Sequence, residues 1–115
     1  MNAAGIYADE VARLAKDESI EIHPRRGQYH ILDRAFSGFV RRPIFPVPTK
    51  VSKGIVVIPT VDGNTLIGPD AEDIDDKEGT YTTAAGLKDV VAGALRLVPN
   101  VASLMPPISQ YSGLR

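Results

Sequence analysis

Hydrophobic positions in the C-terminal half of the chain follow the period of an α-helix. Apolar residues recur three or four positions apart from Leu87 to Val98, so on a helix they share one face. That stripe consists of Leu87, Val90, Val91, Ala94, Leu95 and Val98. The hydroxyl of Thr82 or Thr83 can cap the N-terminus of this helix, and Pro99 stops it because proline breaks helical hydrogen bonding. We expect this helix to be the longest in the fold.

A second, shorter helix is predicted from Ala8 to Lys16. Its apolar residues fall on one face, and Asp9 and Glu10 occupy the first turn, where the helix dipole favours acidic side chains. The residues just before this helix, from position 2 to position 5, are all small. They allow the backbone to come close to a neighbouring group.

Shorter patterns predict strands in the first two thirds of the chain. Ser19–His23 alternates apolar and polar residues, and Gly27–Leu32 is rich in good strand formers, with a proline separating the two. The clearest pattern is a hairpin, because Gly54–Thr60 and Thr65–Gly68 are joined by a turn that contains Asp62-Gly63.

The remaining segments are predicted to be turns, loops or extended chain. Phe36–Phe39 is a turn, Val40–Val47 is extended between prolines, Gly68–Thr80 is a polar surface loop, and Val101–Ser112 is a last extended stretch. Together the elements predict an α+β fold, a mostly antiparallel β-sheet with about two helices packed on one side.

Composition sets limits on the class of protein. The chain has 115 residues, enough for one small domain, and its net charge of -1 offers no field that would attract nucleic acid. It contains no cysteine, which excludes disulfides, thiolate metal sites and cysteine catalysis. Its start lacks a signal-peptide pattern, and its longest apolar run, Ile55–Ile58, is far shorter than the roughly 20 residues that span a bilayer.

Charges are distributed unevenly along the chain. Basic residues dominate from position 23 to position 53, namely Arg25, Arg26, Arg34, Arg41, Arg42, Lys50 and Lys53. Acidic residues dominate from position 62 to position 89, and they crowd at Asp70, Glu72, Asp73, Asp75, Asp76 and Glu78. The asymmetry is consistent with an anion-binding face, or with two surfaces that attract each other within the fold. We favour the second interpretation.

No catalytic or metal-binding motif stands out from the residues alone. A calcium loop starting at Asp73 fails, because Glu78 and Ala84 stand where glycine and glutamate are required. His23 and His30 lack further ligands, so no metal site is predicted. The chain also lacks a glycine-rich phosphate loop of standard spacing.

Several short motifs, taken in order along the chain, resemble one superfamily of enzymes. The motifs are Asn2-Ala3-Ala4-Gly5, Pro24-Arg25-Arg26-Gly27-Gln28-Tyr29, Phe45-Pro46-Val47-Pro48, Ile58-Pro59-Thr60-Val61-Asp62-Gly63, Leu66-Ile67-Gly68-Pro69-Asp70-Ala71-Glu72-Asp73 and Tyr111-Ser112-Gly113-Leu114-Arg115. Their order and spacing resemble the D-amino-acid oxidase-like flavoproteins. Within these, the branch of FAD-dependent glycerol-3-phosphate dehydrogenases and L-2-hydroxyglutarate oxidases is the most similar.

This resemblance implies a division of the chain and a cofactor. Residues 1–16 correspond to the end of a strand-turn-helix unit of the FAD domain, and residues 17–115 to a substrate-binding domain truncated at its C-terminal end. The implied cofactor of the parent protein is FAD, and the implied cofactor-contacting residues are Asn2, Ala3, Ala4 and Gly5. The implied location is the cytoplasm, or the periphery of the inner membrane.

The resemblance also implies a substrate and residues that hold it. The substrate would be a small anion with a hydroxyl or amino group, oxidised through the flavin of the parent protein. Arg115 matches the family arginine that holds the substrate anion, and Tyr29 and Arg26 are further candidates for substrate binding. No residue of the chain alone is predicted to be catalytic.

Alternatives remain open at this point. The parent could act on glycerol 3-phosphate, on L-2-hydroxyglutarate or on an amino acid, and the chain could instead be a stand-alone, non-catalytic binding domain. For the isolated chain we expect no retained FAD and no turnover, because an FAD domain in cis is missing. We also expect self-association or marginal stability, because the surface that such a domain would cover is exposed.

Overall fold

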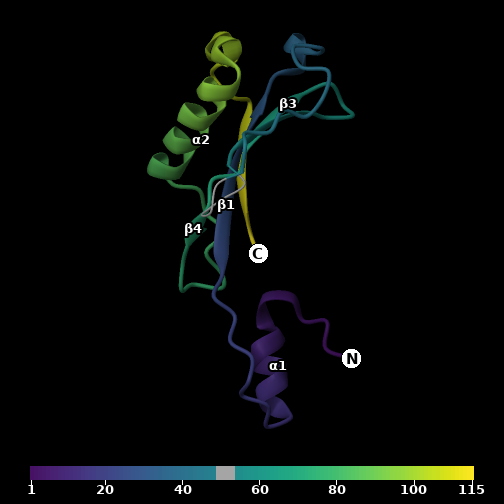
Figure 1. The fold of residues 1–115 in the computed structure, drawn as a ribbon, viewed down its shortest axis with the longest axis vertical. Helices are drawn as coiled ribbons and strands as arrows, with labels where there is room; N and C mark the ends of the chain where they lie inside the picture. Colours follow the sequence, from purple (N-terminus) through teal and green to yellow (C-terminus); the bar gives the residue numbers. More distant parts are fainter. Residues whose placement is uncertain (49–53) are drawn as a thin grey trace.

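The computed structural model describes residues 1–48 and 54–115, so Lys50 and Lys53 of the basic run lie outside the described residues. In the described part of the chain, five antiparallel strands form one sheet and a long helix covers one of its faces (Figure 1). The α+β fold predicted from the sequence is therefore confirmed. No described helix is long and apolar enough to cross a membrane.

Strand β1 (Arg25–Leu32) is the centre of this sheet. Along one edge it pairs with β3 (Thr65–Gly68) and with the two-residue β4 (Glu72–Asp73), and along the other edge it pairs with β5 (Ser109–Leu114). β1 thereby joins segments that lie far apart in the sequence.

The predicted hairpin is present as β2 (Val56–Pro59) and β3, which pair in antiparallel register. The turn closes with a hydrogen bond from the Thr60 amide to the Asn64 carbonyl, 2.9 Å long. Gly63 has a φ of 87°, a conformation that glycine adopts without strain. The Asp-Gly pair was thus a reliable local signal.

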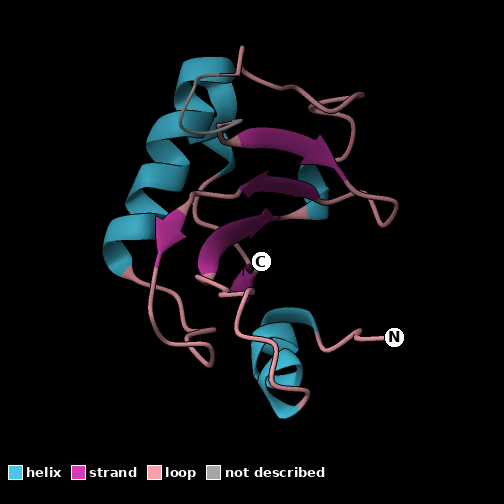
Figure 2. Cartoon of the chain, turned by 60° about the horizontal axis from the view of Figure 1, so that its bottom comes forward, coloured by secondary structure: helices cyan, strands magenta, loops and turns pink. Residues whose placement is uncertain are grey.

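Helix α2 (Ala84–Leu97) begins at the predicted cap, because the Thr83 hydroxyl accepts a hydrogen bond of 3.1 Å from the Gly86 amide. The helix lies along the sheet (Figure 2). Its residues Val90 and Ala94 are fully buried. Both belong to the hydrophobic core, which consists of Leu32, Val40, Val57, Ile67, Val90, Ala94, Val101 and Leu104. The predicted apolar stripe is therefore the face that packs on the sheet.

One predicted extended segment is wrong, and a second is wrong in its first part and correct from Ser109 onward, where β5 begins. Ser19–His23 is irregular chain, because pairing begins only at Arg25, where strands β4 and β5 lie on either side. Within Val101–Ser112, the first part belongs to the 3-10 helix η3 (Pro99–Leu104). Pro99 suits the first turn of a helix, and Val101 and Leu104, three residues apart, turn one face into the core.

The predicted surface loop Gly68–Thr80 is more ordered than expected. It contributes β4 to the sheet, and its Gly79 is buried. The reason is charge pairing, since Arg25 and Arg26 lie opposite Asp73 and Glu72 in the strand register. The two oppositely charged segments therefore attract each other within the fold, as the favoured interpretation of the charge pattern predicted.

The short helices lie at the margins of the sheet. Helix α1 (Ala8–Leu14) follows the 3-10 turn η1 (Gly5–Tyr7), and both lie beyond one end of the sheet rather than against the face that α2 covers (Figures 1 and 2). The predicted turn at Phe36–Phe39 overlaps the 3-10 helix η2 (Arg34–Phe36).

Candidate functional site

The two faces of β1 have opposite characters. Arg26, Gln28, His30 and Leu32 are buried on the face toward α2, whereas the alternate residues of the strand, apart from Gly27, are only half-buried on the other face. We call the first the closed face and the second the open face. The three predicted substrate residues are divided between them.

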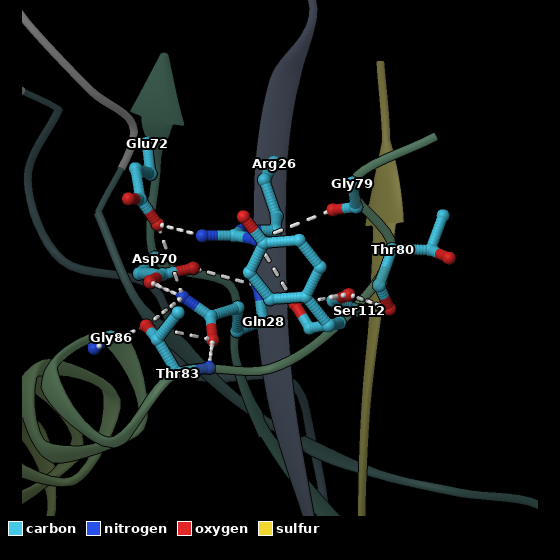
Figure 3. Close-up of polar contacts among 10 residues, drawn as sticks. Arg26, Gln28, Asp70, Glu72, Gly79, Thr80, Thr83, Gly86 and Ser112 are labelled. Carbon is cyan, nitrogen blue, oxygen red and sulfur yellow. Dashed lines mark hydrogen bonds and ion pairs between the residues drawn. The ribbon is translucent and has the colours of Figure 1, made fainter. Parts of the chain in front are cut away.

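Gln28 is the central residue of the closed face and has no exposed surface (Figure 3). Its backbone amide and its side-chain amide both donate to the Asp70 carboxylate, at 2.6 and 2.7 Å. Its side-chain oxygen accepts from the Thr83 amide at 2.5 Å. One side chain therefore ties β1 to the loop after β3 and to the start of α2.

Arg26 also lies on the closed face and is only 2 % exposed. Its guanidinium donates to Glu72 at 2.8 Å and to the carbonyls of Gly79 and Tyr81 at 3.3 and 3.2 Å (Figure 3). The hydrogen bond to Glu72 raises the pKa of the guanidinium, against the opposing effect of burial. These contacts give Arg26 a structural role, and its predicted role in substrate binding stays a prediction that they do not support.

Tyr81 and Ser112 complete the enclosure of Arg26. The guanidinium carbon lies 4.3 Å from the centre of the Tyr81 ring, a distance typical of a cation–π contact. The Ser112 hydroxyl donates to the Thr80 carbonyl at 2.6 Å, which holds the loop against β5. The arginine is thereby surrounded by groups of the chain itself.

The open face carries two stacked tyrosines. Tyr29 of β1 stands opposite Tyr111 of β5, and their ring centroids are 4.9 Å apart with an interplanar angle of 10°. Burial, and then the neighbouring Tyr29, raise the pKa of the Tyr111 phenol, so its hydroxyl stays protonated. Tyr111 remains 43 % exposed, which leaves the outer side of the stack open to a ligand.

Gly113 forms an open floor beside this stack, which we call the glycine floor. It stands opposite Gly27 in the register, two positions along from the Tyr29–Tyr111 pair and therefore on the same face. The Gly27 side is covered, because a Cβ there would lie 2.9 Å from the Cβ of Pro69. No heavy atom lies within 4 Å of the point where a Cβ of Gly113 would sit. A small ligand can therefore approach the backbone of the sheet at this position.

Arg115 lies at the other end of the glycine floor. Its Nη1 atom is 3.4 Å from the point that a Cβ of Gly27 would occupy, and its backbone exchanges two hydrogen bonds with Arg25. Arg25 itself is bound by the Asp73 carboxylate at 2.6 and 2.9 Å, whereas the Arg115 guanidinium forms no salt bridge among the described residues. A free guanidinium can bind a carboxylate or phosphate with two hydrogen bonds.

The predicted cofactor-contacting residues, Asn2, Ala3, Ala4 and Gly5, form a largely exposed turn ahead of α1. The Asn2 side chain accepts from the Ala4 amide at 3.2 Å and donates to the Ala8 carbonyl at 2.7 Å, which holds the turn in shape. Gly5 has a φ of 58° and open space where a Cβ would be. The turn therefore fits a close backbone contact with a flat group such as FAD, but it has no charged side chain for a pyrophosphate.

Lys77 connects this turn to the sheet domain. Its ammonium group donates to Asp9 at 2.6 Å and to Glu10 at 3.0 Å, and Tyr7 contacts Glu78. The hydrogen bond from Lys77 lowers the pKa of the buried Asp9 carboxyl to about 2. The position of α1 thus depends on a charge pair between segments that the sequence separates by almost seventy residues.

Sequence reasoning did not identify several residues that shape both faces. Gln28, Asp70 and Thr83 form the closed-face network, and Tyr111 and Gly113 form the open face with the predicted Tyr29 and Arg115. The alternation of Arg26, Gln28 and His30 is a signal that could have indicated one shared face. The described residues include no cluster of three or more histidine, cysteine or acidic side chains arranged to hold a metal ion.

Known proteins resemble this chain along its whole length. A glycerol 3-phosphate dehydrogenase of Caloramator mitchellensis is 45% identical over 115 residues, which are 100% of this chain and 24% of that protein. A glycerol 3-phosphate oxidase of Mycoplasma pneumoniae is 45% identical over 80 residues, covering 70% of this chain and 21% of the relative. The chain spans about a quarter of the length of these relatives.

Solved structures agree with the sequence relatives. The dithionite-reduced L-alpha-glycerophosphate oxidase of Mycoplasma pneumoniae with FAD bound matches with a TM-score of 0.83 and 37% identity, over 99% of this chain and 30% of that one. The glycerol-3-phosphate dehydrogenase of Bacillus halodurans complexed with FAD shares the fold, with a TM-score of 0.71 and 19% identity over 95% of this chain and 22% of that one. The predicted resemblance is confirmed.

A sequence profile identifies the family of this chain. The profile described as FAD dependent oxidoreductase, abbreviated DAO, matches residues 1–115. This chain belongs to the DAO family of FAD-dependent oxidoreductases.

Proposed function

We propose that this chain forms the substrate-binding part of an FAD-dependent enzyme that oxidises glycerol 3-phosphate. The family and the names of its relatives support the reaction class. The observation that carries the proposal is the open face, where a glycine floor separates a stacked tyrosine pair from the free guanidinium of Arg115. That arrangement suits a small ligand with a hydroxyl at one end and an anion at the other.

Each group on the open face has a distinct role in this proposal. Arg115 binds the anionic end of the substrate, because its planar fork matches two oxygens at once. Tyr29 and Tyr111 offer phenol hydroxyls to the hydroxylated end, and Gly113 leaves room for the carbon chain. When bound in the longer enzyme, FAD would supply the redox chemistry.

The closed face and the N-terminal turn support that role without touching the substrate. The Gln28 network keeps β1 at a constant position relative to α2, so Tyr29 and Gly27 stay aligned with β5. In this proposal Asn2, Ala3, Ala4 and Gly5 contribute backbone contacts to the FAD, and other parts of the longer enzyme hold its pyrophosphate.

We further propose that the 115-residue chain alone neither retains FAD nor turns over substrate. The relatives are about four times longer, and this chain has no glycine-rich phosphate loop. Purified chain should be colourless, and a fluorescence titration should show no FAD binding at micromolar concentration. Yellow protein, or saturable quenching of FAD fluorescence in that range, contradicts this proposal.

Substrate binding by the open face can be tested on the isolated chain by NMR. Adding glycerol 3-phosphate should shift the backbone amide signals of Tyr29, Gly113 and Arg115, whereas glycerol, which lacks the anion, should leave them unchanged. The variant Arg115→Gln should lose the response. Shifts confined to other regions, or equal shifts with glycerol, contradict the assignment of this face.

The same titration separates the alternative substrates. An L-2-hydroxyglutarate dehydrogenase of Indibacter alkaliphilus is 36% identical over 50 residues, which are 42% of this chain and 12% of that protein. L-2-hydroxyglutarate also presents an anion beside a hydroxyl, so it can engage Arg115. Stronger binding of that compound than of glycerol 3-phosphate would replace the proposed substrate with this alternative.

A further inference from the structure

A row of three charged residues crosses the open face at one end of the sheet. Arg25 of β1 stands opposite Asp73 of β4 on one side, and on the other its backbone pairs with that of Arg115, the residue after β5 (Figure 1). Residues opposite each other on neighbouring strands turn their side chains to the same face, with Cβ atoms about 5 Å apart. Two arginines and one carboxylate are therefore immediate neighbours.

The ion pair between Arg25 and Asp73 is exposed to water. The Asp73 carboxylate accepts from Nε and Nη2 of Arg25 at 2.6 and 2.9 Å, and the two side chains remain 71% and 35% exposed, respectively. Exposed ion pairs contribute little stability, because water and salt screen the attraction between the charges. A stronger anion can therefore displace Asp73 from Arg25 at little cost to the fold.

Arg25 also has hydrogen-bond donors to spare. A guanidinium carries five N–H donors, and Asp73 accepts from two of those of Arg25. In the described ranges 1–48 and 54–115, no other group accepts from this side chain. Arg26 differs, because two backbone carbonyls and the Tyr81 ring surround it in addition to its carboxylate. Arg25 can therefore serve a ligand, whereas Arg26 cannot.

The charges of the row suit an anion with more than one negative charge. The hydrogen bond from Arg25 lowers the pKa of the Asp73 carboxyl, so Asp73 is ionised at neutral pH and repels an incoming anion. Two guanidiniums and one carboxylate leave a single net positive charge. A phosphate monoester carries close to two negative charges at pH 7. It therefore competes with Asp73 for Arg25 more strongly than a single carboxylate does.

We infer that Arg25 is a second phosphate-binding residue, which a phosphate monoester displaces from Asp73 and binds together with Arg115. The inference rests on the proposed function, because it extends the anion-binding position assigned to Arg115. Asp73 then distinguishes anions by their charge. An anion with one charge binds Arg115 alone, and an anion with two charges binds both arginines.

The first test follows the Nε and Cζ NMR signals of the two arginines in the native chain. Inorganic phosphate and glycerol 3-phosphate should shift the signals of Arg25 and Arg115 with the same dissociation constant, because one anion contacts both. Lactate, which has a single carboxylate, should shift the Arg115 signals alone. The variants Arg25→Gln and Arg115→Gln assign the signals by removing them. Equal shifts of both arginines with lactate overturn the discrimination by charge.

The second test removes the competing carboxylate. Asp73→Asn should bind inorganic phosphate and glycerol 3-phosphate at least about threefold more tightly, because Arg25 is free and one repulsive charge is gone. Asp75→Asn is the matched control. Asp75 is exposed and has no hydrogen bond or ion pair within the described part of the chain, so its removal changes the net charge equally without freeing Arg25. Its affinity should change less than about twofold.

A double variant assigns the gain to Arg25. Asp73→Asn combined with Arg25→Gln should lose the increase in affinity that Asp73→Asn shows alone. Equal gains in Asp73→Asn and Asp75→Asn overturn the inference, and so does a full gain in the double variant, with circular dichroism confirming that each variant is folded. If Asp73→Asn does not fold, the NMR titration of the native chain decides the question.

The two phosphate ligands separate this inference from the proposed function. If inorganic phosphate shifts both arginines and glycerol 3-phosphate shifts neither, the role of Arg25 is supported and the proposed substrate is wrong. If glycerol 3-phosphate shifts Arg115 alone, the proposed substrate is supported and the inference is overturned. If neither ligand shifts the Arg25 signals, the inference is overturned as well.

Discussion

The closed and open faces of β1 come from alternate residues of one strand, yet they use similar side chains differently. On the closed face, Arg26 is enclosed by a carboxylate, two carbonyls and an aromatic ring. On the open face, the Arg115 guanidinium lies beside a glycine floor without a salt bridge among the described residues. An arginine satisfied by its own chain holds the fold together, whereas one without such partners is available to a ligand.

The largest expected effect follows from removing the centre of the closed face. Gln28→Leu removes the side-chain donor to the Asp70 carboxylate, which keeps only the backbone amide of residue 28, and leaves the Thr83 amide without its acceptor. The free energy of unfolding should therefore fall by about 3 kcal/mol. On the open face, Tyr29→Phe should change the free energy of unfolding by less than about 0.5 kcal/mol. Urea unfolding monitored by circular dichroism measures both. Similar losses in the two variants would remove the distinction between the faces.

The two arginines provide the next comparison. Arg115→Gln should weaken the binding of glycerol 3-phosphate about tenfold or more and leave the unfolding midpoint nearly unchanged. Arg26→Gln should lower the unfolding midpoint, because it breaks the contacts to Glu72 and Tyr81. It should leave the binding of glycerol 3-phosphate nearly unchanged, because it removes nothing from the open face. NMR titration and urea unfolding of each variant separate the effects. An affinity loss in Arg26→Gln matching that of Arg115→Gln would restore Arg26 as a substrate residue.

A glycine on each face sharpens the comparison further. A Cβ at Gly86 would collide with the buried Gln28 amide and the Asp70 carboxylate, so Gly86→Ala should destabilise the fold by about 1 kcal/mol even though alanine favours helix. Gly113→Ala meets open space and should leave stability within about 0.5 kcal/mol, while it weakens ligand binding at the glycine floor. Thermal unfolding measures the stability of both variants, and ligand titration measures the affinity of Gly113→Ala. A Gly86→Ala variant more stable than the native chain would contradict the packing described for the closed face.

The smallest effect expected is a pH dependence confined to the closed face. His30 is buried, its Nε2 contacts the Leu87 carbonyl at 3.2 Å, and its Nδ1 has no partner. Burial lowers the pKa of its imidazole below 6.5, so the unfolded chain binds the proton first as pH falls. Stability contributed by neutral His30 should therefore be present above pH 6.5 and decline below it.

The control for this pH dependence is His30→Gln, whose unfolding free energy should vary less between about pH 7 and pH 5. The low pKa values of Asp9 and Asp73 act in a different window, since their stabilising contribution is lost only as pH falls below the ordinary carboxyl range near 3.8. Identical slopes for the native chain and the variant across the window of the histidine would exclude His30 as the cause.

Local patterns predicted those elements whose signals lie within a few neighbouring residues. The cap at Thr83, the apolar stripe of α2 and the hairpin around Gly63 all depend on nearby side chains, and all three are present. The extended assignment of Ser19–His23 was wrong because a strand needs a partner, and partners are supplied by distant segments. The basic and acidic runs correctly indicated attraction, but not which pairs would form.

Sequence by itself determined the family, the helix α2, the β2–β3 hairpin and the presence of Tyr29 and Arg115 as candidate substrate residues. Only the tertiary structure decided that Tyr29 and Arg115 share a face while Arg26 is enclosed on the other. The physical reason is register. Which face a residue takes follows from alternation along its own strand, but which residues stand beside it depends on how β1, β4 and β5 pair. That pairing comes from contacts between residues about fifty to ninety positions apart.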